Sequence, residues 1–303
     1  MGASVGSTYA TVIWNTDKLA DSQVEYGLTT SYGSSTTLDP SLVTSHSQVL
    51  SGLGAATLYH YRVKSRSGAG TLAVSGDITF TTLSGTNPPG LIAYLKMDEG
   101  SGTVATDSSG NGNAGTLMNG AGWTAGHSGQ AVALDGVSGY VRIPHAAGLD
   151  AYPLTVAVWF KSTTTTGWRA LVNKYLAGSM NGYQVFFSGG NLCAWYFRDS
   201  SNYIFDGTGC PLSTAGTNDG LWHQAVFVVD ATGGRLYVDG AQKASRAWTG
   251  VAAAPTTTQD VQLGHYPGGA EATAYVPGAL DEVQVYNRAL TAAEVLALFN
   301  ALP

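Results

Sequence analysis

Apolar and polar residues alternate in short runs along most of this chain. The runs Trp222–Asp230 and 236–240 are rich in Val, Phe, Trp and Tyr, and they flank the segment Ala-Thr-Gly-Gly at 231–234. Period-two alternation is typical of strands, and a short glycine-containing loop between two such runs is typical of a β-hairpin. The second run ends in Asp239-Gly240, which predicts a further turn. The pattern therefore predicts antiparallel strands here.

The first 82 residues repeat this pattern on a smaller scale. Alternating runs cover 10–15, 22–27, 46–50, 59–65 and 77–82. Short strands at such intervals predict a small β-sandwich. Pro88 and Pro89 cannot continue a strand, so we expect a linker stiffened by proline. The predicted organisation is a first domain over 1–83, a linker over 84–90 and a second domain over 91–303.

One segment near the end departs from the strand pattern. In 291–298, Thr291 and Glu294 fit a capping box, and the Ala and Leu residues that follow favour a helix. The sequence thus predicts an all-β chain with one short C-terminal helix. We interpret this helix as a packing element.

Two motifs of the second domain resemble a known family. They are the run Trp222–Asp230 with its following Leu-Tyr-Val-Asp-Gly, and Gly-Ala-Leu-Asp-Glu-Val-Gln-Val-Tyr-Asn-Arg-Ala-Leu at 278–290. Together they resemble the laminin-G-like, concanavalin A-like jelly-roll family over residues 91–303. The resemblance implies a jelly-roll sandwich that binds glycans or proteins more often than it catalyses.

The first domain resembles a second family. Trp14, then Val-Glu-Tyr-Gly at 24–27, then the segment 53–63 are similar to a fibronectin type III domain, in the variant found before metallophosphatase domains. No phosphatase domain follows in this chain. The resemblance implies a spacer that presents the second domain.

Charge and composition exclude several classes of partner. The formal net charge is -6, and the 14 Lys and Arg residues form no basic run, which argues against a nucleic-acid or anionic-membrane partner. No apolar run approaches the ~18 residues of a membrane span, so we expect no membrane insertion. The first residues lack the pattern of a signal peptide, and we expect none at this start of the chain. We expect a fragment of a larger secreted, bacterial protein.

Cys193 and Cys210 are the only cysteines of the chain. A turn-like segment separates them, which suits facing strands of one hairpin and favours a disulfide. Two buried free thiols are the alternative. A zinc site is not supported, because two cysteines lack the spaced partners that zinc requires.

Enzyme motifs are weak in this sequence. A glycosidase needs two carboxylates around one bond, and no Asp or Glu here has another two positions away, the spacing that would put both on one face of a strand. Asp281 and Glu282 are adjacent and would point to opposite faces of an extended strand. The six histidines form no His-Glu-x-x-His pattern, so a metalloprotease is unsupported. We expect a non-catalytic protein, with a polysaccharide-degrading enzyme as an alternative.

The resemblance also implies a metal site. In the laminin-G-like family an Asp-rich turn and the Asp of the Asp-Glu-Val motif are commonly near one calcium ion. Carried over by matching motif, the implied calcium ligands are Asp107, Asn111, Asn113 and Asp281. The alternative is an Asx turn without metal, because Asn and Asp also cap their own backbone.

Aromatic and cationic residues are dense between 168 and 203, which suggests a ligand surface for a saccharide. Alternation puts Cys193, Trp195 and Phe197 on one face of their strand, and Leu192, Ala194 and Tyr196 on the other. A sandwich core also uses aromatic rings, so residues near loops are the better candidates. The predicted ligand-binding residues are Lys174, Tyr175, Tyr183, Arg198, Tyr203, His265 and Tyr266. The expected partner is a glycan, with a protein partner as the alternative.

Overall fold

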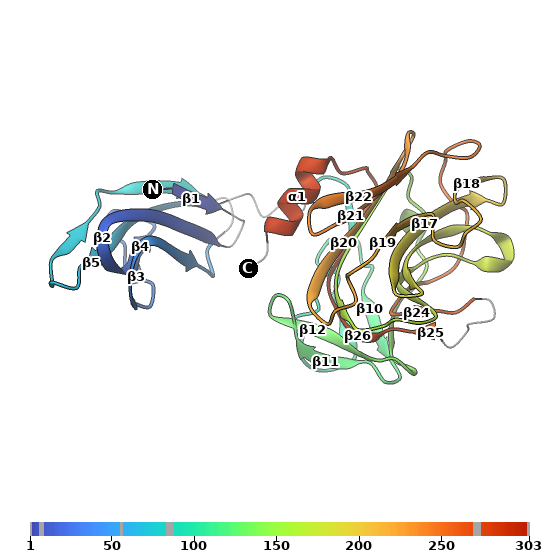
Figure 1. The fold of residues 1–303 in the computed structure, drawn as a ribbon, viewed down its shortest axis with the longest axis horizontal. Helices are drawn as coiled ribbons and strands as arrows, with labels where there is room; N and C mark the ends of the chain where they lie inside the picture. Colours follow the sequence, from blue (N-terminus) through green and yellow to red (C-terminus); the bar gives the residue numbers. More distant parts are fainter. Residues whose placement is uncertain (1, 6–8, 55–56, 83–87, 269–273, 302–303) are drawn as a thin grey trace. The chain divides into compact units, whose positions relative to one another are not determined.

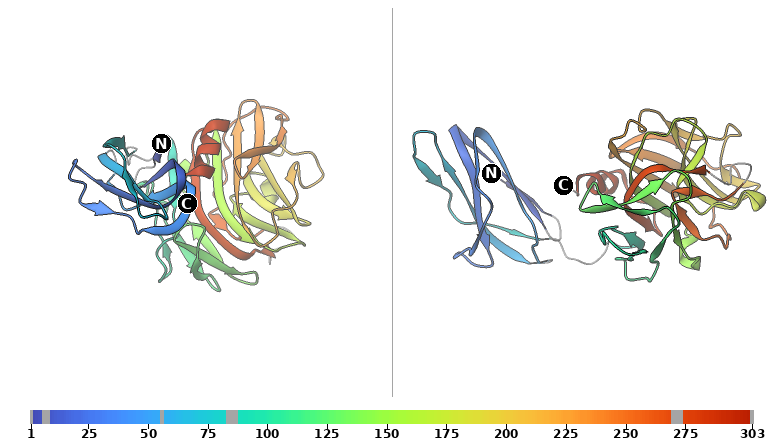
Figure 2. Two further views of the ribbon diagram at one scale, coloured as in Figure 1. Left: turned by 60° about the vertical axis from the view of Figure 1, so that its left-hand side comes forward. Right: turned by 90° about the horizontal axis from the view of Figure 1, so that it is seen from below.

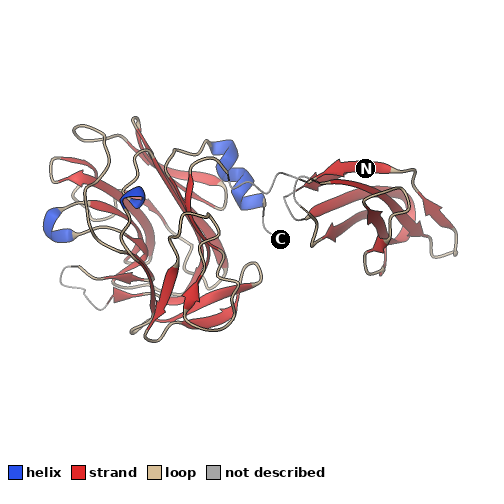
Figure 3. Ribbon diagram, turned by 180° about the vertical axis from the view of Figure 1, so that it is seen from behind, coloured by secondary structure: helices blue, strands red, loops and turns tan. Residues whose placement is uncertain are grey.

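The structure is a computed structural model that describes residues 2–5, 9–54, 57–82, 88–268 and 274–301 (Figure 1). The chain divides into two compact units, Met1–Asn87 and Pro88–Pro303. Residues 84–87 of the predicted linker lie outside the described residues. Strands dominate the described chain and the α-helix stands at its C-terminal end (Figure 3). The prediction of an all-β chain with one short terminal helix is confirmed.

The first unit is built on one long strand that pairs on both sides. Its strands are β1 (Gly2–Val5), β2 (Ala10–Gly27), β3 (Ser34–Ser35), β4 (Asp39–Leu50), β5 (Leu58–Arg66), β6 (Leu72–Val74) and β7 (Ile78–Thr81). The runs 10–15 and 22–27, predicted as separate strands, are the two halves of β2, and the pairing register with β4 shifts between Asn15 and Ala20. Trp14 is buried, and its indole N–H donates to Ser65 Oγ at 2.9 Å.

The second unit is a sandwich of two large antiparallel sheets with a separate two-stranded sheet formed by residues 265–266 and 274–275, seen from three sides in Figures 1 and 2. Its strands are β8 (Leu91–Leu95), β9 (Val104–Ala105), β10 (Gly115–Met118), β11 (Gly122–Ala125), β12 (Gln130–Asp135), β13 (Tyr140–Ile143), β14 (Leu154–Ser162), β15 (Trp168–Asn173), β16 (Gly182–Ser188), β17 (Asn191–Asp199), β18 (Asn202–Ile204), β19 (Leu212–Thr214), β20 (Trp222–Asp230), β21 (Gly233–Val238), β22 (Ala241–Arg246), β23 (Val261–Leu263), β24 (His265–Tyr266), β25 (Ala274–Tyr275) and β26 (Pro277–Tyr286). Two 3-10 turns, η1 (Ala147–Leu149) and η2 (Ala177–Ser179), and the helix α1 (Ala292–Asn300) complete it.

Strand order defines the two layers. Sheet I runs β11-β12-β26-β14-β20-β21-β22, with β8 also paired to β26. Sheet II runs β18-β17-β16-β15-β23-β13-β10-β9, with β19 paired to β17. Figure 1 shows β20 to β22 in one layer and β17 and β18 in the other. Each sheet therefore has an inner face toward the core and an outer face.

The period-two pattern decides which residues fill the core between the sheets. On β17, Leu192, Ala194 and Tyr196 belong to the central core, while Cys193 and Trp195 belong to a separate cluster on the outer face of sheet II. The predicted division of this strand into two faces is confirmed. Strand geometry explains it, because successive side chains point to opposite sides of a sheet.

The hairpin predicted from 222–240 is present. β20 and β21 pair from Ala225↔Val238 to Asp230↔Gly233, and a turn with Asp239 at φ 52° leads into β22. Asp239 Oδ2 lies 2.8 Å from His223 Nδ1, and Asp219 Oδ1 lies 3.2 Å from the other ring nitrogen. Burial lowers the pKa of His223, but these two carboxylates outweigh burial and raise it. His223 thus connects the turn at Asp219 with the turn at Asp239.

Helix α1 begins at the predicted capping box. The Thr291 hydroxyl accepts the backbone N–H of Glu294, and the Glu294 carboxylate accepts that of Thr291. Val295 is buried in the same apolar cluster as Tyr286 and Val226 on the outer face of sheet I. Among the described residues, the structure has no helix with the length and apolar character that crossing a membrane requires.

Candidate functional site

The outer face of sheet II carries a cluster of aromatic rings. We call this cluster the aromatic face, and its residues are Trp168, Tyr175, Phe186, Trp195, Phe197, Tyr203, Phe205 and Tyr266. They come from β15 to β18, from β24 and from the connections between strands. Neighbouring strands lie about 4.8 Å apart, so residues that face the same side on adjacent strands bring their rings into contact.

Trp195 stands at the centre of the aromatic face. Its ring centroid lies 4.4 Å from that of Phe186 and 5.2 Å from those of Trp168 and Tyr175. The ring planes meet at 45° to 65° in these pairs. Tilted and edge-to-face contacts at this range are the favourable ones for aromatic pairs. The rings therefore form a packed, pre-arranged surface.

The rings of the aromatic face differ in their exposure to solvent. The buried rings form its floor, and the partly exposed rings form its margin. Trp195 is only 2 % exposed, whereas Trp168, Tyr203 and Phe205 are partly exposed. The indole Nε1 of Trp195 is buried and has no hydrogen-bond partner among the described residues. Buried donors are normally satisfied, so a group of this kind suits a ligand acceptor or an ordered water.

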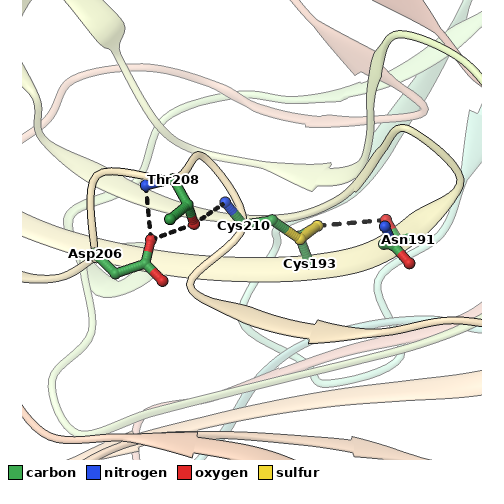
Figure 4. Close-up of a disulfide and its surroundings, with 5 residues drawn as sticks. All are labelled: Asn191, Cys193, Asp206, Thr208 and Cys210. Carbon is green, nitrogen blue, oxygen red and sulfur yellow. Dashed lines mark hydrogen bonds between the residues drawn. A yellow bond between two sulfur atoms is a disulfide. The ribbon is translucent and has the colours of Figure 1, made fainter.

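A disulfide holds the loop at the edge of the aromatic face. Cys193 on β17 and Cys210 are bonded, with their Cα atoms 5.2 Å apart (Figure 4). Within the loop, Asp206 Oδ1 accepts the backbone N–H of Thr208 at 2.9 Å and its hydroxyl at 2.6 Å. A Cβ on Gly209, which has φ +86°, would lie 2.9 Å from the Trp168 ring, so glycine lets the loop lie against that ring. The predicted disulfide is confirmed.

The structure brings together three of the seven residues predicted to bind a ligand. Tyr175, Tyr203 and Tyr266 all lie on the aromatic face. Tyr203 contacts Phe197 with ring centroids 5.4 Å apart, and it belongs to the partly exposed margin. Tyr175 and Tyr266 are 6 % and 4 % exposed, so they support the rings around them.

Two predicted ligand residues point into the protein instead. Tyr183 is fully buried in the central core, and its hydroxyl donates to Leu149 O at 3.1 Å. Lys174 is also fully buried, with Nζ 3.0 Å from Asp150 Oδ1 and 2.7 Å from Gln259 O. Burial lowers the pKa of Lys174, and Asp150 partly offsets this. The expectation that these two side chains face a ligand is wrong in this structure, because each satisfies a buried polar partner.

Arg198 and His265 are not members of the aromatic face, although each is next in sequence to a residue of that face. The Arg198 guanidinium is 3.6 Å from Asp199 and donates to Val251 O. His265 is 7 % exposed and stacks on Tyr275 with ring centroids 4.1 Å apart. Its Nδ1 lies 2.6 Å from Gln262 Oε1. Neither residue joins the three tyrosines.

Sequence reasoning left Phe205 out and chose no tryptophan for the site. Trp195 was visible in the sequence, since alternation placed it on one face with Cys193 and Phe197. The signal for Trp168 and Phe205 was weaker, because they lie at the start of a strand and after the end of another. Only the folded loop shows that they border the same surface.

The turn proposed to hold calcium is already rich in hydrogen bonds. Asp107 Oδ1 accepts the backbone N–H groups of Tyr94 and Ser109, both at 2.9 Å. Asp107 Oδ2 accepts the Ser109 hydroxyl and the Asn113 backbone N–H, both at 2.8 Å. Burial raises the pKa of Asp107, and these bonds outweigh it and lower the pKa. A carboxylate offers about four acceptor positions, and all four are used here.

The other implied calcium ligands are engaged as well. Asn111 and Asn113 donate their side-chain amides to Leu91 O and Ile92 O. Asp281 Oδ2 accepts two backbone N–H groups from residues 127 and 128. Within the described ranges, no three or more His, Cys, Asp or Glu side chains are grouped so that they could hold a metal. The turn has the geometry of an Asx turn.

Known proteins share this architecture. Residues 135–296 match the laminin G family model described as the concanavalin A-like lectin/glucanases superfamily. No curated protein matches the chain. Among solved structures, domain 4 of AbnA, a GH43 extracellular arabinanase from Geobacillus stearothermophilus, in complex with arabinotriose, is similar, with 23% identity and a TM-score of 0.52 over 69% of this chain and 97% of that one.

Toxin binding domains are also similar. The binding domain of botulinum neurotoxin DC in complex with rat synaptotagmin II has 10% identity and a TM-score of 0.53, over 71% of this chain and 52% of that one. A botulinum neurotoxin type C structure, described by its dependence on two ganglioside molecules for cell entry, has 11% identity and a TM-score of 0.54 over the same shares, 71% and 52%. The chain thus spans about half the length of these toxin domains. At these levels of sequence identity, the similarity to the toxin domains concerns the fold alone. The family model matches more than half of the sequence, so the chain belongs to the concanavalin A-like lectin/glucanases superfamily.

Proposed function

We propose that this chain is a non-catalytic carbohydrate-binding fragment of a secreted protein, and that the aromatic face holds the saccharide. The observation that carries the proposal is the margin of partly exposed rings, Trp168, Tyr203 and Phe205, above the unpartnered indole N–H of Trp195. Saccharides stack their C–H faces on aromatic rings and offer hydroxyl oxygens to buried donors. The aromatic face supplies both kinds of contact.

The loop closed by the disulfide supports this proposal. Cys210 is bonded to β17, and Asp206 caps the turn before it, so the loop beside Trp168 is held in place. A pre-arranged surface loses less conformational entropy when a ligand binds. The AbnA domain of the same fold was solved in complex with arabinotriose, which makes arabinotriose a first probe. The disulfide also supports an extracellular location, because such bonds persist in oxidising compartments.

The burial of the adjacent acidic pair supports a non-catalytic role. Asp281 and Glu282, the adjacent acidic pair, are 0 % and 3 % exposed. A glycosidase requires two carboxylates that flank a bound sugar in an open cleft. Turnover of a polysaccharide panel would overturn this part of the proposal.

A protein partner is the second candidate, favoured by the similarity to a toxin domain in complex with rat synaptotagmin II. A fibronectin type III-like first domain, acting as a spacer, and a calcium ion at the Asp107 turn also remain proposals. The fibronectin likeness rests on sequence motifs, and the calcium ion would have to displace hydrogen bonds that Asp107 already accepts.

Titration calorimetry with arabinotriose, after a glycan array, tests the function. Tyr203→Ala should weaken binding by about 1–3 kcal/mol, the scale for removing one ring from an apolar contact. Tyr140→Ala is the matched control, since Tyr140 is a partly exposed tyrosine of β13 outside the aromatic face. Equal affinity in both variants and the parent would move the site elsewhere. Failure of every glycan, with capture of a protein partner, would favour the second candidate.

A further inference from the structure

The outer face of sheet I changes from buried to exposed along β14. Its outward residues are Ala157, Trp159 and Lys161, which alternate with the core residues Val156, Val158 and Phe160. Ala157 is buried in the cluster beneath helix α1. Trp159 is 4 % exposed and lies between His127 and Phe299, with ring centroids at 3.5 Å and 5.6 Å. Lys161 is exposed, so this end of the outer face is open.

A groove crosses five strands, β11, β12, β26, β14 and β20, at that open end. Strand pairing puts Ala133 of β12 beside Ala279 of β26, Ala279 beside Lys161 of β14, and Lys161 beside Trp222 of β20. The groove has a volume of about 380 Å³. Its lining residues are Thr124, Ala125, Ala133, Lys161, Ser162, Thr163, Gly220, Trp222, Pro277, Gly278 and Ala279. This volume falls within the range of small-molecule sites.

Small residues keep the floor of the groove low. Ala133 and Ala279 carry only a methyl group, and a Cβ on Gly278, which has φ +143°, would lie 2.0 Å from Lys161 O. Glycine at that position lets β26 approach β14 closely. The two larger side chains, Trp222 and Lys161, stand together at one end of the row. The floor thus exposes backbone and methyl groups beside one indole ring and one ammonium group.

Lys161 has no carboxylate partner within the described part of the chain. Asp219 precedes the lining residue Gly220, but its carboxylate accepts the Leu221 N–H at 2.8 Å and contacts His223 at 3.2 Å. Trp222 is partly exposed, and its ring meets His127 edge-on at 6.3 Å. An available cation beside an available ring suits a ligand that is both negatively charged and apolar on one face.

The neighbouring row of paired residues on the same strands is polar, and several of its buried polar atoms lack hydrogen-bond partners among the described residues. Gln224 pairs with Trp159, and Trp159 pairs with Asp281, each two positions beyond a residue of the groove. Gln224 Oε1, Trp159 Nε1 and Asp281 Oδ1 are buried without a hydrogen-bond partner among the described residues, as is Nδ1 of the overlying His127. Unsatisfied buried groups are uncommon in folded proteins, and they cluster here beside the groove. These atoms are buried, so they lie beneath the surface next to the groove, where ordered water can satisfy them.

We propose that this groove is a second carbohydrate site, which binds an acidic sugar residue. The uronate carboxylate pairs with Lys161, a C–H face of the pyranose ring stacks on Trp222, and hydroxyls of the sugar lie toward the rim, where Thr124 and Thr163 bring their own hydroxyls. The groove lies on sheet I and the aromatic face lies on sheet II, so the two sites occupy opposite faces of one sandwich. The proposal does not depend on what the aromatic face binds.

The test is titration calorimetry of the full chain with a trimer of galacturonate and with a neutral hexose trimer. The acidic trimer should bind and the neutral trimer should bind at least ten-fold more weakly. Lys161→Met should weaken binding of the acidic trimer by about 10- to 100-fold, the range for a hydrogen bond to a charged group. Lys243→Met removes another exposed lysine of sheet I, on β22, and should change nothing. Raising the salt concentration should weaken binding of the acidic trimer.

Further variants separate this site from the aromatic face. Trp222→Phe keeps a ring and should retain most of the affinity, whereas Trp222→Ala should lose it, with unfolding curves recorded for each. Tyr203→Ala alters only the aromatic face and should leave binding of the acidic trimer unchanged. Loss of binding in Tyr203→Ala but not in Lys161→Met would overturn the proposal. Equal binding of both trimers, no binding of the acidic trimer at millimolar concentration, or equally tight binding of an acidic peptide would also overturn it.

Discussion

Opening the disulfide between Cys193 and Cys210 should destabilise the second unit by about 3 kcal/mol. The two cysteines are 17 positions apart, and closing a loop of this length removes about 3 kcal/mol of chain entropy from the unfolded state. For a unit of this size, each kcal/mol shifts the melting temperature by about 2–4 °C. The expected decrease in melting temperature is therefore about 6–12 °C.

The same bond should matter for the aromatic face. It holds the loop in which Asp206 caps Thr208 and in which Gly209 lies against Trp168. Once the bond is open, the loop has more freedom, and saccharide binding at the aromatic face should weaken. The floor residue Trp195 stays buried among Phe186 and its other neighbours, because strand pairing and not the loop positions it.

The assay is urea unfolding of the full chain with and without a thiol reductant, together with titration of free thiols. The double variant in which both cysteines are replaced by alanine should unfold like the reduced parent and should not respond to the reductant. Identical unfolding midpoints for the oxidised and reduced parent, with reduction verified by two reactive thiols, would refute the reasoning.

Three further predictions concern buried or bonded charges. Lys174→Met should cost about 3–5 kcal/mol in urea unfolding, because it leaves Asp150 buried without its partner, and adding Asp150→Leu should recover part of that loss. Burial raises the pKa of Asp281 to about 7. The stabilising contribution of the protonated Asp281 is therefore complete below about pH 4, and up to about 4 kcal/mol of it is lost as the pH rises through 7. In unfolding measurements with a chelator present, Asp281→Asn should reduce the decrease in stability between pH 5 and pH 8. An unchanged dependence of stability on pH would count against this. Asp107→Ala should lower the melting temperature even with a chelator, because it removes four hydrogen bonds. A calcium-dependent rise in the melting temperature of the parent that this variant abolishes would establish the proposed calcium ion. Equal melting curves of the parent with and without calcium would rule out the calcium ion.

Local patterns in the sequence predicted several of the elements and the division of single strands into faces. The alternation in 191–197 separates Trp195 from Tyr196, and the structure puts them in the outer and central clusters respectively. The capping box at Thr291 predicted the start of α1, and the Asp-Gly turn after 238 predicted the end of β21. These features depend on backbone geometry within a few residues, so neighbouring sequence determines them.

The tertiary structure decided which face meets the core and which strands become neighbours. Lys174 and Tyr175 are adjacent in sequence, yet one pairs with Asp150 inside the protein and the other joins the aromatic face. Alternation predicts that two neighbours differ, but only the partner sheet and the loops around them decide which one is inside. Tyr183 shows the same limit, since its burial depends on residues of η1 far away in sequence.

The groove on sheet I shows this limit most fully. Ala133, Lys161, Trp222 and Ala279 are far apart along the chain and become one row only through the pairing of β12, β26, β14 and β20. Trp222 and Ala279 belong to two different motifs and Ala133 and Lys161 to neither, so no local motif of the sequence brings the four together. Long-range strand order has no short-range signature, because it is the common burial of the inner faces that selects it. The sequence alone therefore determines which residues form strands, and the packed sandwich determines which of them share a site.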